Sequence, residues 1–207
     1  MFYLAIQDKN IDPKILKYGK EEFLEKGFEK ASIRNICRKA EVTTGAFYTR
    51  YKNKDELFLD IVSDTLDQIN TMMYSEEEMP TFSQNQDGET EMGWLFTAQA
   101  SGEIMNFIYD NYDDMRLLLC YSSGSSCEDF LHIFIDKSTS LVFDYFNNIK
   151  DVRFELLINK EELHLIYTSF WTAMFEPVVH EFSRRQALNY SKILSRFFNF
   201  EAIVNIY

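Results

Sequence analysis

Three histidines and three cysteines are the side chains of this 207-residue chain best suited to metal binding or nucleophilic chemistry. Glu128 and His132 stand four residues apart, as do Glu176 and His180. This spacing places both side chains of a pair on one face of a helix, where they could supply two metal ligands. Because neither pair has a third candidate nearby, and His164 lies on a separate segment, we predict no metal site.

The cysteines, Cys37, Cys120 and Cys127, are few and odd in number. That usage is typical of a protein in a reducing cytosol rather than of a disulfide framework. Cys120 and Cys127 flank a serine-rich break, so a redox switch remains an alternative, whereas we expect Cys37 to be packed. No catalytic set stands out, and the sequence predicts neither an enzyme nor a bound cofactor.

Positive charge gathers near the N-terminus of a chain whose net charge is −12. Residues 30–54 hold seven Lys or Arg and one acid, whereas residues 61–207 carry 9 basic and 23 acidic residues. A local excess of positive charge is typical of a DNA-binding surface, because the phosphate backbone of DNA is negatively charged. A solvated helical face is the alternative interpretation of the charge pattern.

The elements that must position this charge are short helices with recognisable caps. Asp12-Pro13 begins a first helix and Gly27 ends it. Ser32 and Thr43 then cap two short helices separated by a tight turn, and Asn53 caps a fourth helix. The order of these elements predicts a helix-turn-helix over residues 32–52.

In such a motif one helix crosses the DNA backbone while the second lies in the major groove. We expect residues 44–52 to form the second helix. Its N-terminal residues are small, so the helix end can approach the duplex closely and its free backbone N–H groups can donate to phosphate.

The stretch Ile15–Phe58 resembles the N-terminal domain of TetR-family regulators, over 44 residues or about a fifth of the chain. The features that carry the resemblance are Phe23, Gly27-Phe28, Ser32-Ile33, Ile36, Ala40, Val42, Gly45, Phe47-Tyr48, Tyr51 and Lys54-Asp55-Glu56-Leu57.

The resemblance implies DNA contacts at nine positions. Base edges or nearby phosphates would be met by Thr44, Gly45, Ala46, Thr49 and Arg50. The DNA backbone would be met by Thr43, Tyr48 and Lys54, and phosphate or the groove edge by Arg34. A core position for the aromatic ring remains an alternative for Tyr48.

Four residues depart from the family pattern: Ala31, Cys37, Glu41 and Arg50. Glu41 replaces the common glycine of the turn and must therefore accept the turn geometry. Arg50 replaces a frequent histidine, which would change base preference because arginine pairs well with guanine.

For the whole chain we predict an all-α fold of about nine helices, with no sheet beyond a trivial pair. Seven Gly and three Pro are too few for the turns of most β-rich folds. The expected domains are residues 9–69, which bind DNA, and residues 70–207, with a loop at 75–93. No apolar run spans a bilayer and no secretory leader is visible, so we expect a cytoplasmic protein without membrane contact.

Two wide apolar stripes close the sequence and must be buried against something. The resemblance implies that they form a homodimer interface; the alternative is an intramolecular core. The residues expected in the interface are Phe170, Met174, Ile193, Phe197 and Phe198.

The resemblance also implies a helical pocket for a small-molecule effector. Candidate lining residues are Trp94, Met105, Tyr109, Phe130, Phe134 and Trp171, although aromatic residues in helices are usually core. The predicted function is a repressor that binds a pseudo-palindromic operator in double-stranded DNA and is released by an unknown effector. A protein-interaction module and an all-α enzyme are the alternatives.

Overall fold

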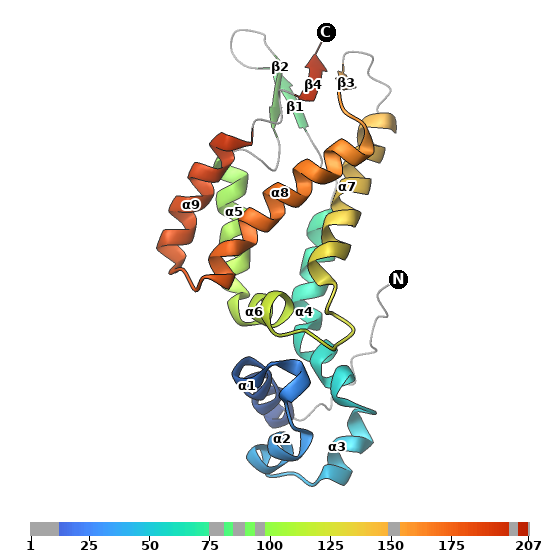
Figure 1. The fold of residues 1–207 in the computed structure, drawn as a ribbon, viewed down its shortest axis with the longest axis vertical. Coiled ribbons are helices and arrows are strands. Elements are labelled where there is room, and N and C mark those ends of the chain that lie inside the picture. Colours follow the sequence, from blue (N-terminus) through green and yellow to red (C-terminus); the bar gives the residue numbers. More distant parts are fainter. Residues whose placement is uncertain are drawn as a thin grey trace. The chain divides into compact units, whose positions relative to one another are not determined.

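The structure, a computed structural model, describes residues 13–74, 81–84, 90–93, 98–148, 154–198 and 203–206. Over these residues it contains nine helices (Figure 1), which confirms the all-α prediction. They are α1 (Pro13–Lys30), α2 (Ile33–Ala40), α3 (Thr44–Arg50), α4 (Lys54–Tyr74), α5 (Ala98–Asp110), α6 (Tyr112–Cys120), α7 (Phe130–Asn148), α8 (Lys160–Val179) and α9 (Arg184–Phe197).

Within the described ranges, four short strands form two antiparallel pairs. Strand β1 (Thr81–Gln84) pairs with β2 (Thr90–Gly93), and β3 (Phe154–Leu156) pairs with β4 (Val204–Ile206). The first pair lies inside the segment 75–93, where we expected a loop, so that local prediction was wrong. Such two-stranded ribbons add little to an all-α fold.

The chain divides into two compact units. One unit consists of the described part of Met1–Gln68 together with Asp113–Phe130, and the other contains the rest of the described chain. The segment Asp113–Phe130 therefore packs with the N-terminal helices, although the sequence suggested that it belongs to the C-terminal domain.

An aromatic cluster forms the core of the first unit. The rings of Phe23, Phe28 and Phe58 lie with centroids 5.2–5.8 Å apart. Gly27 has φ 73° and interrupts the helical backbone of α1 where the sequence predicted its end. This left-handed step, which glycine adopts without strain, turns the chain so that the Phe28 N–H donates to the Tyr121 carbonyl at 2.9 Å.

Asp114 of α6 joins two helices of the same unit. Its carboxylate lies 2.6 Å from the Lys20 ammonium of α1 and accepts a 2.9 Å hydrogen bond from the Thr65 hydroxyl of α4. The Ser126 N–H also donates to the Asp55 carboxylate at 2.8 Å. Polar contacts thus hold α6 and the following turn to α1 and α4.

In the second unit α9 packs along α5 (Figure 1), and α8 supplies the most buried side chains. Phe170 and Met174 of α8 are fully buried within the chain itself. Their assignment to a dimer interface was wrong, because they lie on the inner side of the stripe: the Phe170 ring meets Trp171 and Phe198. No helix in the described ranges is long and apolar enough to cross a membrane.

Candidate nucleic-acid interface

Helix α2 is held at both ends by caps that the sequence contains. The Ser32 hydroxyl accepts a hydrogen bond from the Asn35 N–H, and Glu41 closes the helix with φ 60° and ψ 35°. Glu41 thus adopts the left-handed conformation that the turn needs, at the cost of about 1–2 kcal/mol that this conformation imposes on a residue with a side chain. Its carboxylate also lies 3.2 Å from the exposed Lys14 ammonium, a contact that contributes little in water.

Glu41→Gly is expected to stabilise the protein by about 1 kcal/mol or less, because glycine relieves the left-handed strain but is more flexible when unfolded. Urea unfolding followed by circular dichroism measures the change. A clear loss of stability would show that the side chain contributes more than the strain costs.

Thr43 caps the start of helix α3: its hydroxyl oxygen accepts a hydrogen bond from the Ala46 N–H at 3.1 Å. It ends at Arg50, two residues earlier than expected, because Tyr51 leaves the helical conformation. Phe47 and Tyr51 are buried and fix one side of α3 to the core. These two buried side chains therefore fix the orientation of α3 on the core of the first unit.

The predicted DNA-contacting residues lie on the other side of α3. Tyr48 is 55% exposed, which excludes the core position considered for it. The remaining exposed members of the set are Thr43, Thr44, Gly45, Thr49 and Arg50, with Arg34 exposed on α2 and Ala46 half-buried.

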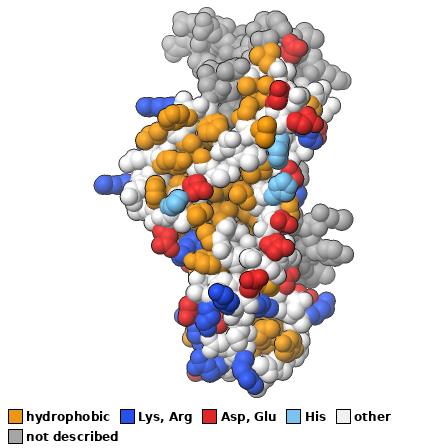
Figure 2. Space-filling view, viewed as in Figure 1, with side chains coloured by type: hydrophobic (Ala, Val, Ile, Leu, Met, Phe, Trp, Pro, Cys, Tyr) orange, Lys and Arg blue, Asp and Glu red, His pale blue; other side chains and the backbone are white. Residues whose placement is uncertain are grey.

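The hydroxyl groups on this surface have defined roles. The Thr49 hydroxyl donates to the Gly45 carbonyl at 2.9 Å, so its lone pairs and methyl group stay available for other contacts. The Thr43 oxygen accepts from the Ala46 N–H, so its own proton stays available to donate. In Figure 2, Lys and Arg side chains gather over the part of the molecule that the N-terminal helices form.

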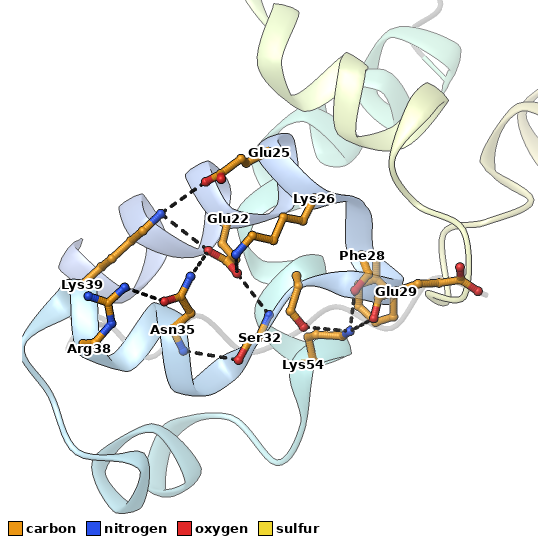
Figure 3. Close-up of polar contacts among 11 residues, drawn as sticks. Glu22, Glu25, Lys26, Phe28, Glu29, Ser32, Asn35, Arg38, Lys39 and Lys54 are labelled. Carbon is orange, nitrogen blue, oxygen red and sulfur yellow. Dashed lines mark hydrogen bonds and ion pairs between the residues drawn. The ribbon is translucent and has the colours of Figure 1, made fainter.

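Lys54, expected to anchor a phosphate, is engaged within the protein. Its ammonium donates to the carbonyls of Phe28, Glu29 and Ala31, at 3.1 Å for Glu29 and 3.2 Å for Ala31, and lies 4.4 Å from the centre of the Phe28 ring (Figure 3). Burial lowers the pKa of Lys54, and the charge of Glu29 only partly opposes this. All three ammonium donors have protein acceptors, so Lys54 stabilises the end of α1.

Lys54→Ala is expected to cost about 1–3 kcal/mol of stability, since it leaves carbonyls at the end of α1 without a charged donor. The matched control is Lys52→Ala. Lys52 is 89% exposed and only faces Glu56 at 3.5 Å, so its loss should cost less than about 0.5 kcal/mol. Thermal unfolding of both variants tests this, and equal melting temperatures would contradict it.

Glu22 is the polar centre of the first unit and was not singled out from the sequence. It is fully buried, and its carboxylate accepts from the Lys26 ammonium at 2.7 Å, the Asn35 amide at 2.8 Å and the Ser32 N–H at 3.4 Å (Figure 3). The Lys39 ammonium lies 3.5 Å away. One carboxylate on α1 thereby fixes the start of α2.

The pKa of Glu22 reflects this setting. Burial, the largest influence, raises the pKa, but the hydrogen bonds from Lys26, Asn35 and Ser32 together leave it lower than usual.

The sequence contains a signal that could have identified Glu22. It is a charged residue inside an otherwise apolar stripe, because it shares one helical face with Ile15, Gly19 and Phe23.

The predicted pocket residues are only partly brought together. The rings of Phe134 and Trp171 meet edge to face at 4.7 Å, and Met105 is also buried in the second unit. Phe130 is buried but belongs to the first unit, and Trp94 lies outside the described residues. Tyr109 donates its hydroxyl to the Phe182 carbonyl at 2.7 Å, and burial raises its pKa to about 12.

Several large apolar side chains are exposed on α8 and α9. Ile193 is 54% and Phe197 79% exposed, whereas Phe198 is half-buried against Phe170. Figure 2 shows hydrophobic side chains gathered over these two helices. Further large apolar side chains exposed on α8 and in the turn after it are Leu165, Val179 and Phe182.

The chain resembles known regulators in sequence and in fold. Residues 15–61 match the family model described as bacterial regulatory proteins, tetR family. A relative from Bacillus subtilis (strain 168), named an uncharacterized HTH-type transcriptional regulator YvdT, is 36% identical over 72 residues. That match covers 33% of this chain and 37% of the relative.

Solved structures extend the likeness of the fold to most of the chain. A TetR-like regulator from Rhodococcus sp. RHA1 has a TM-score of 0.57 at 15% identity, covering 95% of this chain and 97% of that one. NalD of Pseudomonas aeruginosa, described as the secondary repressor of the MexAB-OprM multidrug efflux pump, has a TM-score of 0.53 at 18% identity and coverages of 88% and 93%. Over residues 15–61, the N-terminal helices of this chain thus match the tetR family of bacterial regulatory proteins.

Proposed function

We propose that the protein is a cytoplasmic transcriptional regulator that binds DNA as a homodimer and acts as a repressor released by a small effector. The observation that carries the proposal is the exposed polar side of helix α3. Its inner side is fixed by Phe47 and Tyr51, while its outer side presents Tyr48, Thr49 and Arg50 to solvent. A rigid short helix with exposed polar groups suits the major groove.

The exposed residues suggest a division of roles. Tyr48 and Thr43 have hydroxyl donors for phosphates, which position the domain without reading sequence. Arg50, at the end of α3, offers a guanidinium that can pair with guanine, and Thr44 stands at the helix start. Arg34 on α2 adds positive charge next to the groove.

Dimerisation is supported by the exposed apolar side chains of α8 and α9. Ile193 and Phe197 are exposed, and large apolar side chains gathered in one area of a surface are normally covered in solution. A two-fold dimer presents two copies of α3, so the operator should be an inverted repeat.

An effector site in the second unit is supported by buried polar atoms. Ser101 Oγ on α5, Thr139 Oγ1 on α7 and Trp171 Nε1 on α8 are buried with no hydrogen-bond partner among the described residues. Burying such atoms unpaired is costly, so an effector with hydrogen-bonding groups would stabilise them.

The short connection between α5 and α6 is the route by which effector binding would affect the DNA-binding helices. Only Asn111 separates α5 from α6. Within the first unit, Asp114 of α6 contacts both Lys20 of α1 and Thr65 of α4. A shift of α5 on effector binding would therefore displace α6 and, through Asp114, the helices that position α2 and α3.

The proposal is tested by selecting bound duplexes from a pool of random sequence. We expect enrichment of an inverted repeat whose half-sites lie about one helical turn apart, or a multiple of it. The control protein is Tyr48→Asp, which should enrich nothing because it places a negative charge next to phosphates. No enrichment by the wild-type protein would overturn the proposal and favour a protein-interaction module.

A further inference from the structure

A buried carboxylate of α1 and an exposed guanidinium of α2 are joined by one side-chain amide. The Glu22 carboxylate, which is fully buried, accepts a hydrogen bond from Asn35 Nδ2 at 2.8 Å. Asn35 Oδ1 in turn accepts a hydrogen bond from the Arg38 guanidinium at 2.7 Å. The hydrogen bonds therefore run from the core of the first unit to its surface, as Figure 3 shows.

The two ends of this chain of hydrogen bonds fix the direction of the Asn35 amide. The ionised Glu22 carboxylate can only accept hydrogen bonds, and the Arg38 guanidinium can only donate them. The amide must therefore turn its amino group to Glu22 and its oxygen to Arg38. Glu22 is itself held by the Lys26 ammonium at 2.7 Å and the Ser32 N–H at 3.4 Å, so the amide has a fixed support.

Arg38 lies on the face of α2 that is directed away from the core. Arg34 and Arg38 are one helical turn apart and both are exposed, so they lie next to each other on the surface. The buried residues of α2 are Ile36, Cys37 and Ala40, on another side of the helix. The exposed face of α2 therefore presents two guanidinium groups.

The charge of Arg38 is available to a partner outside the protein. The neighbouring Lys39 ammonium lies 3.5 Å from both Glu22 and Glu25, so acids of α1 balance its charge. Among the described residues no acid pairs with Arg38, whose printed contact is the neutral Asn35 oxygen. A guanidinium has five N–H donors, so most of them stay available for an anion.

In a helix-turn-helix the first helix crosses the DNA backbone, so cations on its exposed face lie next to phosphates. We propose that Arg38 is a further DNA-binding residue that contacts a backbone phosphate, and that Asn35 is a positioning residue that orients the Arg38 guanidinium for this contact. An oriented guanidinium loses less conformational entropy on binding than a free one. The inference rests on the proposed DNA-binding function and adds a position that the family resemblance did not imply.

The test for Arg38 is a fluorescence-anisotropy titration of a selected inverted-repeat duplex and a scrambled duplex at several salt concentrations. Arg38→Ala should weaken binding to both duplexes by the same factor, at least about tenfold, because phosphate contacts carry no sequence information. A two-fold dimer loses two such contacts, so the slope of log affinity against log salt should become shallower by about two units.

Arg185→Ala is the matched control, because it removes the same charge from an exposed position on α9, in the second unit. It should change the affinity by less than about twofold, since exposed charges far from the DNA are screened by salt. Circular dichroism melting verifies that each variant folds.

Asn35→Ala tests whether Asn35 acts through Arg38. It should weaken DNA binding by about threefold or more in the wild-type background, and by less than about 1.5-fold where Arg38 is already replaced by alanine. A purely structural role of Asn35 would give the same loss in both backgrounds. Asn35→Ser replaces Asn35→Ala if the alanine variant does not fold.

The possible failures are distinguishable. Wild-type affinity and salt slope in Arg38→Ala would overturn the inference and leave the proposed function intact, and a loss confined to the inverted repeat would show a base contact instead of a phosphate contact. Equal losses from Asn35→Ala in both backgrounds would overturn its positioning role. A wild-type protein that binds neither duplex would contradict the proposed function itself, and with it this inference.

Discussion

Glu22→Ala is expected to destabilise the N-terminal unit by about 2–4 kcal/mol. The substitution removes the acceptor for the Asn35 amide and the Ser32 N–H and leaves Lys26 without its 2.7 Å partner. Breaking a buried charged network from one side leaves its other members unpaired, which costs more than the network contributes in total. The start of α2 would lose its fixed position, so DNA binding should weaken as well. Urea unfolding followed by circular dichroism measures the loss of stability.

Glu25→Ala is the matched control. Glu25 is on the same helix and exposed, and it contacts only Lys39, at 3.5 Å. Its loss should cost less than about 1 kcal/mol. Comparable unfolding midpoints for the two variants would show that Glu22 is not the polar centre of this unit.

The stability of the same unit should fall in acid. The pKa of Glu22 is lower in the folded protein than in the unfolded chain, where the carboxylate titrates near 4.5. The stabilisation is therefore complete above pH 4.5 and is lost as the pH falls through the folded value. Glu22→Gln should remove this part of the pH dependence, measured by urea unfolding between about pH 3 and pH 6. An unchanged slope in that range would contradict the assignment.

Phe197→Asp combined with Ile193→Asp is expected to convert dimers into monomers. Each exposed side chain would be buried twice in a two-fold interface, and covering one such side chain contributes about 1.5–3 kcal/mol. The dimer should weaken by more than about 100-fold, which analytical ultracentrifugation resolves.

Tyr48→Asp serves as the control for this pair, since it also places a charge at an exposed aromatic position, but in the first unit. It should leave the dimer intact while abolishing DNA binding. Dimers that persist in the Phe197 and Ile193 variant would show that the interface lies elsewhere.

Local signals in the sequence were reliable where the chemistry is local. The caps at Ser32 and Thr43, and the interruption at Gly27, all act within a few residues. They were sufficient to predict the helix-turn-helix, whereas the exposed positions expected to meet DNA were implied by the family resemblance. The end of α3 was misplaced by two residues because Tyr51, whose N–H still donates to the Phe47 carbonyl, takes an extended conformation and is buried.

Features that depend on distant contacts could not be predicted in this way. The periodicity of α8 and α9 indicated two wide apolar stripes but not which side chains the chain itself covers. Phe170 and Met174 of α8 are buried, whereas Phe197 of α9 is exposed. The resemblance assigned Lys54 to phosphate, and the sequence did not reveal its carbonyl acceptors because they lie more than twenty residues earlier. The same holds for His132 and His164, which only the packing of α7 and α8 brings to Asp136.

The most direct test of the central claim is a fluorescence-anisotropy titration of a selected inverted-repeat duplex and a scrambled duplex at several salt concentrations. The wild type should prefer the inverted repeat, with an affinity that falls steeply as salt rises. Arg50→Ala should retain the salt dependence of the scrambled complex but lose about 1–3 kcal/mol of preference at one symmetric pair of positions. Equal affinity of the wild type for both duplexes, in the absence of any effector, would contradict the account of a sequence-reading α3.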